Sequence, residues 1–414
     1  MDRYDEFIKD CRGAAADFLR VLKNRSLPLA IVHHNDADGI ASASALTFVF
    51  DRLSLECRLL PLEKIHESIL EKIHQGERQV LVYADLGGQS SHIVGRCAVN
   101  DPLVIILDHH LPGGPVPANV IHLNPETYGI SGDTEASGAS VSALFGIELL
   151  KEANRWSLRE EAVAAALGVL GAAGDGQTED GLTGLNRILM DRALGQGELA
   201  ESAQGLTLPR LGNRTMKEIV EILNLLGSIG FYAGHSRKGI DFLHGRNPDE
   251  ALRLSRDLLA MKNAFFRKER ERIEKEGLQQ TSRFQWVTVE NRFAPMGVKS
   301  IGLFLEMLLD ENLTSSSKYL IGFQHLPAVM PVLGDLGLSL TKVSSRVHKE
   351  LRASIEEGKL PDFMTLIPEA AAMVGGAADG CHRYTAASLI GRNDEEKFLE
   401  ALEKVLAGFT KTVD

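Results

Sequence analysis

The chain has 414 residues, more than one compact domain usually contains, so its length favours two or three domains. Hydrophobic residues make up 44% of the chain and charged residues 24%, which is the balance of a folded globular protein and argues against a disordered one. The formal net charge of -11 argues against a basic surface that coats nucleic acid, although a local groove can still be positive.

The cysteines and the first residues indicate the cellular compartment. The cysteines are scattered with no CxxC pair, which predicts reduced thiols and no zinc knuckle; they are Cys11, Cys57, Cys97 and Cys381. Residues 1–20 have the pattern of a charged amphipathic helix rather than a signal peptide, and no apolar run approaches the roughly 20 residues of a membrane span. We therefore expect a cytoplasmic protein without a membrane partner.

From residue 27 onward, short apolar runs alternate with helical patterns. Residues 27–34, 78–86 and 102–110 have the pattern of buried strands, and residues 41–53 that of a helix. This alternation predicts parallel strands joined by crossover helices. The next two helical patterns are Ala-rich, with small residues that permit close packing, and cover residues 131–153 and 160–175.

The rest of the chain is predicted to form a connector and a second domain. Residues 191–280 have mainly helical patterns, whereas later residues alternate helical patterns with strand-like runs at 284–290, 318–324 and 336–345. The predicted fold class is therefore α/β. We expect a parallel-sheet domain over residues 1–190, a mainly helical connector over 191–280 and a smaller α/β domain over 281–414. The active site is expected in the cleft between the two lobes.

Asp and His residues cluster where the predicted strands end. These residues are His34, Asp36 and Asp38 after the first strand, Asp85 after the second, Asp108, His109 and His110 after the third, and Asp175 at the end of the second Ala-rich helix. In open α/β sheets, functional groups gather beyond the carboxyl ends of the strands. We therefore expect these side chains to form one site.

A metal centre would explain this density of carboxylates. Ionised Asp side chains raise one another's pKa, so a cluster of them is unfavourable without cations. Oxygen and imidazole ligands without thiolate suit Mn²⁺ or Mg²⁺ better than a structural zinc, and an Asp that bridges two ions would give a two-metal hydrolytic site. Taken singly, each Asp could cap a helix and the His pair could be plain surface residues. Taken together, the clusters favour a metal centre.

The motifs resemble those of the DHH phosphoesterase superfamily, in the same order, over residues 30–180. HNDADG at residues 34–39 resembles the first motif, Asp85 the second, Asp108-His109-His110 with the downstream NPE the third, and Asp175 the fourth. The resemblance implies that His34 and Asp36 hold one metal, that Asp38, His109 and Asp175 hold the other, and that Asp85 bridges them. It also implies two further catalytic residues: His110, which faces the substrate phosphate, and Asp108, which orients its neighbours.

The C-terminal part resembles the DHH-associated domain, which grips the substrate with a Gly-Gly-Gly-His loop. The implied substrate contacts are Ser344, Arg346, Gly375, Gly376, His382 and Arg383. The glycines would let backbone N–H groups approach an anion, and His382 and Arg383 would add charge. The five residues that separate Gly376 from His382 depart from the family pattern. For Ser344 and Arg346, a polar end to a strand is an equally weighted alternative.

The central insertion and the form of the first motif resemble the RecJ-like branch, which degrades single-stranded nucleic acid from an end. The resemblance implies an exonuclease that uses two divalent ions, Mn²⁺ before Mg²⁺, to release mononucleotides from single-stranded DNA or RNA. One alternative is a phosphodiesterase for short oligonucleotides, cyclic dinucleotides or nucleotide bisphosphates, which suits the 6% aromatic content and the acidic balance. The other is a RecJ-like subunit of an assembly with replication or repair proteins as partners, although the occupied ligand positions favour catalysis.

Overall fold

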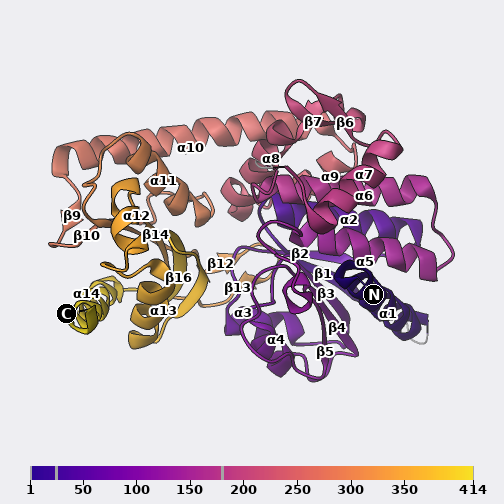
Figure 1. Cartoon of the computed structure of the whole chain (residues 1–414), viewed down its shortest axis with the longest axis horizontal. Helices are drawn as coiled ribbons and strands as arrows, with labels where there is room; N and C mark the ends of the chain where they lie inside the picture. Colours follow the sequence, from indigo (N-terminus) through magenta and orange to yellow (C-terminus); the bar gives the residue numbers. More distant parts are fainter. Residues whose placement is uncertain (1, 24–26, 179–180, 414) are drawn as a thin grey trace. The chain divides into compact units, whose positions relative to one another are not determined.

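The computed structural model describes residues 2–23, 27–178 and 181–413. The chain divides into two compact units (Figure 1). Unit 1 comprises Met1–Arg256 and Pro331–Leu333, and unit 2 comprises Asp257–Met330 and Gly334–Asp414. Within the described ranges, every helix is too short or too polar to span a lipid bilayer.

A parallel sheet forms the centre of unit 1. Its five strands lie in the order β2-β1-β3-β4-β5. The buried strands β1 (Leu29–His34), β3 (Val80–Ala84) and β4 (Leu103–Leu107) confirm the three strands expected from continuous apolar runs. The edge strands β2 (Arg58–Leu62) and β5 (Val120–Leu123) are not among the expected strands. Both are short and partly exposed, and β2 contains Pro61, so neither has a strong strand pattern.

Helices cover both sides of this sheet (Figure 1). α2 (Ala37–Arg52) and α5 (Gly138–Glu152) lie on one side, and α3 (Glu67–His74) and α4 (Ser91–Cys97) on the other. α6 (Leu158–Gly174) packs on α2 and α5, and α1 (Arg3–Lys23) packs on α5. Small residues allow this close approach: a Cβ on Gly168 would lie 3.1 Å from Ala143 Cβ.

The segment between the two sheets is mainly helical, as expected. It contains α7 (Gly184–Gly195), α8 (Met216–Asn224), a π-helical turn (Leu225–Ile229), α9 (Ser236–Leu243) and the long α10 (Pro248–Glu276). It also contains a small antiparallel sheet of β6 (Ala200–Ser202), β7 (Gly205–Leu208) and β8 (Arg214–Thr215). Strands of two to four residues are too short to produce an alternating pattern, which explains why the sequence does not predict them.

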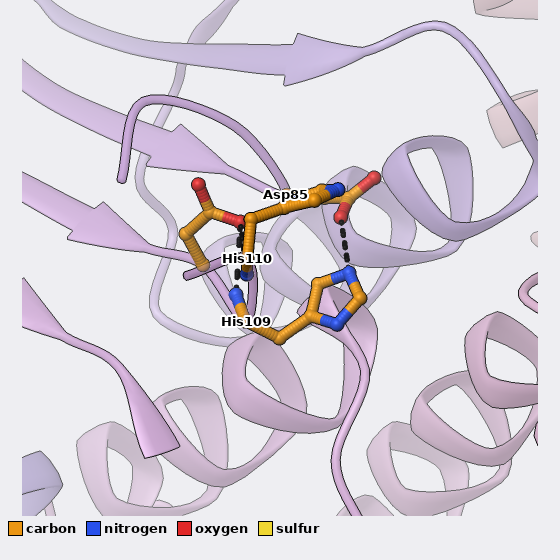
Figure 2. A group of neighbouring side chains, drawn as sticks. Asp85, His109 and His110 are labelled. Atoms are coloured by element: carbon orange, nitrogen blue, oxygen red, sulfur yellow. Dashed lines mark hydrogen bonds and ion pairs between the residues drawn. The ribbon is translucent and has the colours of Figure 1, made fainter. Parts of the chain in front are cut away.

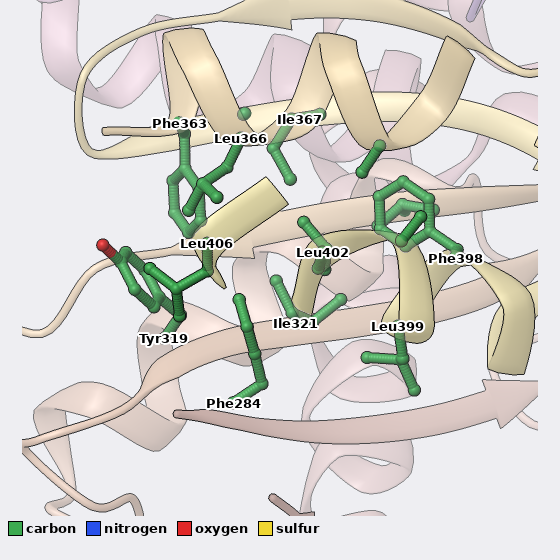
Figure 3. Close-up of a cluster of buried hydrophobic side chains, with 14 of the residues drawn as sticks. Phe284, Tyr319, Ile321, Phe363, Leu366, Ile367, Phe398, Leu399, Leu402 and Leu406 are labelled. Atoms are coloured by element: carbon green, nitrogen blue, oxygen red, sulfur yellow. The ribbon is translucent and has the colours of Figure 1, made fainter. Parts of the chain in front are cut away.

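Unit 2 has a mixed six-stranded sheet in the order β15-β16-β14-β11-β10-β9. These strands are β9 (Gln279–Gln280), β10 (Phe284–Glu290), β11 (Tyr319–His325), β14 (Leu340–Arg346), β15 (Ala377–Cys381) and β16 (Thr385–Gly391). The remaining elements are a hairpin of β12 (Val329–Met330) and β13 (Gly334–Asp335), and helices α11 (Lys299–Asp310), α12 (Lys349–Glu356), α13 (Phe363–Met373) and α14 (Glu395–Val413). Figure 3 shows the hydrophobic core of unit 2, where Phe284 stacks on Tyr319 and Phe398 packs close to the sheet. The expected domain limits at residues 190 and 280 stay a prediction.

Candidate metal centre

The three Asp- and His-rich motifs meet at one edge of the unit 1 sheet. β3 pairs with β1 on one side and β4 on the other, and His33 lies opposite Ala84, which lies opposite Leu107. Because the strands are parallel and their ends are in register, the residues that follow them emerge at the same edge of the sheet. The structure therefore brings together the motifs at residues 34–38, 85 and 108–110.

The first group of possible ligands consists of His34, Asp36 and Asp85. The Nδ1 atom of His34 lies 3.0 Å from Asp36 Oδ2 and 3.3 Å from Asp85 Oδ2. Asp36 also caps α2, since its Oδ1 accepts a hydrogen bond from Gly39 N–H at 3.0 Å. A Cβ on Gly39 would lie 2.4 Å from the carbonyl oxygen of His34, so this tight turn requires glycine at the end of HNDADG.

The second group consists of Asp38, His109 and Asp175. The Nε2 atom of His109 lies 3.2 Å from Asp175 Oδ2 and 3.7 Å from Asp38 Oδ2. Asp175 is at the C-cap of α6. Asp38 is buried and accepts three hydrogen bonds at the start of α5; the donors are Ser137 Oγ–H, Gly138 N–H and Ala139 N–H, at 2.8–3.0 Å. The start of α5 therefore holds the Asp38 carboxylate in place through three donors.

Asp85 contacts both groups, and Figure 2 shows its contact with His109 of the second group. One carboxylate oxygen, Oδ2, faces His34, and the other, Oδ1, lies 3.4 Å from His109 Nε2. Oδ1 is buried and, apart from this ion-pair contact with His109, has no hydrogen-bond partner among the described residues. An orphaned carboxylate oxygen at this depth is unfavourable unless a cation or another donor binds it.

Asp108 lies in a further group of neighbouring donor residues, with Asp85, His109 and His110, and it supports the site through hydrogen bonds. Its Oδ2 accepts from Gly88 N–H at 2.6 Å, and its Oδ1 accepts from His109 N–H at 2.8 Å and lies 2.7 Å from His110 Nδ1. Burial alone would raise the pKa of Asp108, but His110 and the N–H donors lower it below its ordinary value. Asp108 therefore orients the His110 ring, whose side chain stays 38% exposed.

His109 has a fixed orientation. Its Nδ1 lies 2.7 Å from the carbonyl oxygen of Gly132, which can only accept, so Nδ1 carries the proton. In the neutral ring, Nε2 then presents a lone pair to the Asp cluster, which is the arrangement of a metal-ligating histidine. Burial lowers the pKa of His109, but the nearby Asp85 and Asp175 carboxylates outweigh burial and raise it well above the ordinary value.

The cluster has an excess of negative charge, and its donors fit divalent cations. Burial and the neighbouring Asp38 raise the pKa of Asp85, and the same two causes raise the pKa of Asp175. A bound cation would relieve this repulsion. Within the described residues, these groups contain carboxylate oxygens and imidazole nitrogens but no cysteine, which suits a hard or borderline divalent ion.

The six residues expected to contact substrate all lie in unit 2. Ser344 is buried in β14, and the Arg346 guanidinium donates to Glu306 Oε1 (2.9 and 3.0 Å) and to Ser345 O (2.9 Å). Gly375 has φ +70°, and the N–H groups of Gly375 and Gly376 donate to carbonyls of α13 at 3.2 and 2.8 Å, so they cap this helix. His382 and Arg383 lie in the exposed turn between β15 and β16. Their contacts with substrate stay predictions.

Several residues that hold the site are not found by sequence reasoning. Asn124, in the NPE run, donates to the carbonyl of His110 at 2.8 Å, and Gln177 donates to the carbonyl of Gly132 at 2.8 Å. Both act through backbone carbonyls, so residue type and spacing provide no signal for them. The NPE run at least marks the position of Asn124; nothing comparable marks Gln177.

Comparisons with known proteins agree with this arrangement. The sequence profile of the DHH family, N-terminal domain, matches residues 28–169. An uncharacterized protein of Methanocaldococcus jannaschii is 27% identical over 172 residues, which is 40% of this chain and only 36% of that relative's length. The structure of RecJ from Thermus thermophilus in complex with Mn²⁺ matches 97% of this chain and 55% of its own, with a TM-score of 0.62 and 18% identity. A structure of exonuclease RecJ bound to manganese matches 97% of this chain and 94% of its own, with a TM-score of 0.56 and 16% identity. At these identities the structural likeness shows the fold alone.

Proposed function

We propose that the chain is a phosphodiesterase of the DHH superfamily that depends on two divalent cations, because residues 28–169 match the DHH family, N-terminal domain, and the chain has a RecJ-like fold. Its proposed reaction is the hydrolysis of single-stranded DNA or RNA from one end to mononucleotides. The names of the two RecJ structures, one of which is called an exonuclease and both of which contain manganese, support a nuclease reaction with divalent ions. Because RecJ from Thermus thermophilus is also known in complex with Mg²⁺, the order Mn²⁺ before Mg²⁺ is our own proposal.

The position of Asp85 between two groups of possible ligands is the observation that carries this proposal. Its two oxygens lie 3.3 Å from His34 Nδ1 and 3.4 Å from His109 Nε2, so one carboxylate contacts a residue of each group. A site for a single ion would need only one of the groups. A carboxylate shared by two sets of oxygen and nitrogen donors is typical of two-metal hydrolases.

The residues divide into two candidate ligand sets. His34, Asp36 and Asp85 would hold one cation, and Asp38, His109, Asp175 and again Asp85 would hold the other. Divalent cations, when bound, supply Lewis-acid catalysis of phosphate-ester hydrolysis. The buried setting of Asp38 and Asp85 excludes water from the ligands, which strengthens their interaction with cations.

His110 is proposed to face the substrate. Its Nδ1 lies 2.7 Å from Asp108 Oδ1, so the ring is held through one nitrogen, and its partly exposed side chain leaves the other accessible to a phosphate. Asp108 keeps the ring in that orientation. This pair would thus bind and stabilise charge on the phosphate.

The proposed substrate contacts in unit 2 are the residues named above. Arg346 would release the half-exposed Glu306 carboxylate and bind a phosphate with its guanidinium instead. His382 and Arg383, in an exposed turn, would add charge near the strand. Gly375 and Gly376 would take part only through the shape of the helix end, because their N–H groups are used in the cap.

A second candidate is a phosphodiesterase for short oligonucleotides, cyclic dinucleotides or nucleotide bisphosphates. The 6% aromatic content and the net charge of -11 favour it, because a long single strand normally binds to stacked aromatic rings and basic residues. A subunit of a replication or repair assembly is compatible with either activity.

The test is Mn²⁺-dependent hydrolysis of DNA and RNA single strands labelled at the 5′ or the 3′ end, over lengths from about two to thirty nucleotides. Stepwise release of mononucleotides from long strands is the expected result and gives the polarity. Cleavage confined to the shortest substrates would support the second candidate instead. The Asp85→Asn variant is the control, and equal hydrolysis by that variant would contradict the proposed two-cation site.

A further inference from the structure

The turn after α6 places Gln177 beside the candidate metal centre. Gly176 has φ +74°, and the N–H of Gln177 donates to the carbonyl of Ala172 at 2.9 Å, so the turn is a left-handed C-cap. On one side of Gly176, Asp175 faces His109. On the other side, the buried Gln177 side chain faces the loop that precedes α5.

Gln177 binds the same carbonyl that fixes His109. The oxygen of Gly132 accepts from His109 Nδ1 at 2.7 Å and from Gln177 Nε2 at 2.8 Å. Gln177 Nε2 also lies 3.3 Å from the oxygen of Ala136. Since both carbonyls can only accept, the amide must present its NH₂ group to them, and its two hydrogens tie the two parts of the loop together.

A buried chain of polar groups sets the orientation of this amide. Gln177 Oε1 accepts from Asn186 Nδ2 at 2.6 Å, and Asn186 Oδ1 accepts from Ser140 Oγ–H at 2.5 Å. Gln177, Asn186 and Ser140 are all buried, so water does not compete for these bonds. If the Gln177 amide were flipped, its oxygen would face the carbonyl oxygens of Gly132 and Ala136, and its NH₂ group would face the NH₂ group of Asn186. Each of these contacts is unfavourable.

The loop that Gln177 ties together supports two candidate ligands of the same cation. Gly132 holds the His109 ring, and Ser137 with the N-terminus of α5 holds Asp38. We infer that Gln177 is a positioning residue for the cation proposed to bind Asp38, His109 and Asp175. It keeps Gly132 in place so that His109 presents Nε2 to that cation. This inference rests on the proposed two-metal function and deepens it.

The experiment is calorimetric titration of the full chain with Mn²⁺, comparing wild type with Gln177→Met. Methionine has nearly the shape of glutamine but cannot donate. The matched control is Gln79→Met, because Gln79 is also buried and also donates to a backbone carbonyl, that of Ile73, at 2.8 Å. Gln79 lies just before β3, at the opposite end of this strand from Asp85. We expect Gln177→Met to weaken one of two Mn²⁺ sites about 10- to 100-fold and to leave the other unchanged. Gln79→Met should leave both unchanged.

The possible outcomes separate this inference from the proposed function. If Gln177→Met binds Mn²⁺ at both sites as tightly as the wild type, the inference is overturned and the proposed function stands. The same conclusion follows if Gln177→Met and Gln79→Met both weaken the two sites equally. A wild-type chain that binds no Mn²⁺ overturns the function and the inference together. If circular dichroism shows that Gln177→Met does not fold, Gln177→Asn replaces it, because this substitution retracts the amide by one methylene. Gln177→Asn should show the same loss of affinity at one Mn²⁺ site, and unchanged affinity at both sites overturns the inference.

Discussion

Asp85 combines its position between two ligand groups with an unusual backbone conformation. Its φ of +62° lies in the left-handed region, which Asp and Asn adopt more readily than Ala. Gly138, at the start of α5, packs directly against it: a Cβ there would lie 2.5 Å from Asp85 Cβ. The conformation is therefore held by packing, and it directs one oxygen to His34 and the other to His109.

Asp85→Asn should lower hydrolysis by on the order of 100-fold or more, because an amide is a poor ligand for two cations. Substituting even a residue that only supports a metal ligand typically lowers metal affinity or activity about 10- to 100-fold. The variant should still fold, because Asn tolerates the same φ. Asp85→Ala should lose the same activity and also about 1–2 kcal/mol of stability, from the strained backbone. Activity assays and urea unfolding of both variants measure the two effects separately. Full activity in Asp85→Asn would refute the shared-ligand assignment.

The same substitution should have opposite effects on stability with and without metal. In the metal-free protein, Asp38 and burial disfavour the ionised Asp85 side chain, so the neutral amide relieves repulsion. In a chelating buffer at neutral pH, Asp85→Asn should therefore melt at or above the wild-type temperature. With Mn²⁺ the order should reverse, because only the wild type gains binding energy. Thermal melts in EDTA and in Mn²⁺ decide this, and a variant stabilised by Mn²⁺ as much as the wild type contradicts it.

At the level of elements, the metal centre depends on how closely α2, α5 and α6 approach one another. Gly171 in α6 faces α2 and α5, where a Cβ would lie 2.0 Å from Asp38 Oδ1 and 2.3 Å from Ala139 Cβ. The added methyl group would thus push the helices apart at the point where Asp38 is held. Gly13, in α1, is the matched control, because it is also a helix glycine and a Cβ there would meet nothing within 4 Å.

Gly171→Ala should destabilise the chain by about 1–3 kcal/mol and weaken Mn²⁺ binding, since overpacking displaces a ligand. Gly13→Ala should instead stabilise it by about 0.5–1 kcal/mol, through its helix propensity, and leave Mn²⁺ binding unchanged. Urea unfolding and Mn²⁺ titration of both variants provide the comparison. Stabilisation of Gly171→Ala would show that this helix contact is looser than described.

The same elements show what the sequence can and cannot predict. The buried strands β1, β3 and β4 were predictable because each is a continuous apolar run, and the first three motifs were recognisable because each lies at the end of one of these strands. Their adjacency in the sheet was not, because strand order depends on packing between distant segments. Gln177 was not predictable either, since its role depends on the fold bringing Gly132 to it.

At the scale of the whole molecule, the proposed roles divide between the two units. The candidate metal ligands belong to unit 1, and the candidate substrate contacts belong to unit 2. Each unit has its own sheet, and the core of unit 2 is built entirely from its own residues, among them Phe284, Tyr319 and Phe398. Metal binding should therefore stabilise unit 1 directly.

Scanning calorimetry of the full chain should then resolve two unfolding transitions, of which Mn²⁺ raises one. At a free Mn²⁺ concentration 100 times Kd, each ion adds about 2.7 kcal/mol to the unit that binds it. Phe398→Leu identifies the other transition, because Phe398 is fully buried in the core of unit 2 and its truncation lowers that unit's stability alone. Asp85→Asn should remove the Mn²⁺ shift without moving the transition that Phe398→Leu lowers. A Mn²⁺ shift in that second transition alone would place the cations outside unit 1, and a single transition that shifts as a whole would show that the two units unfold together.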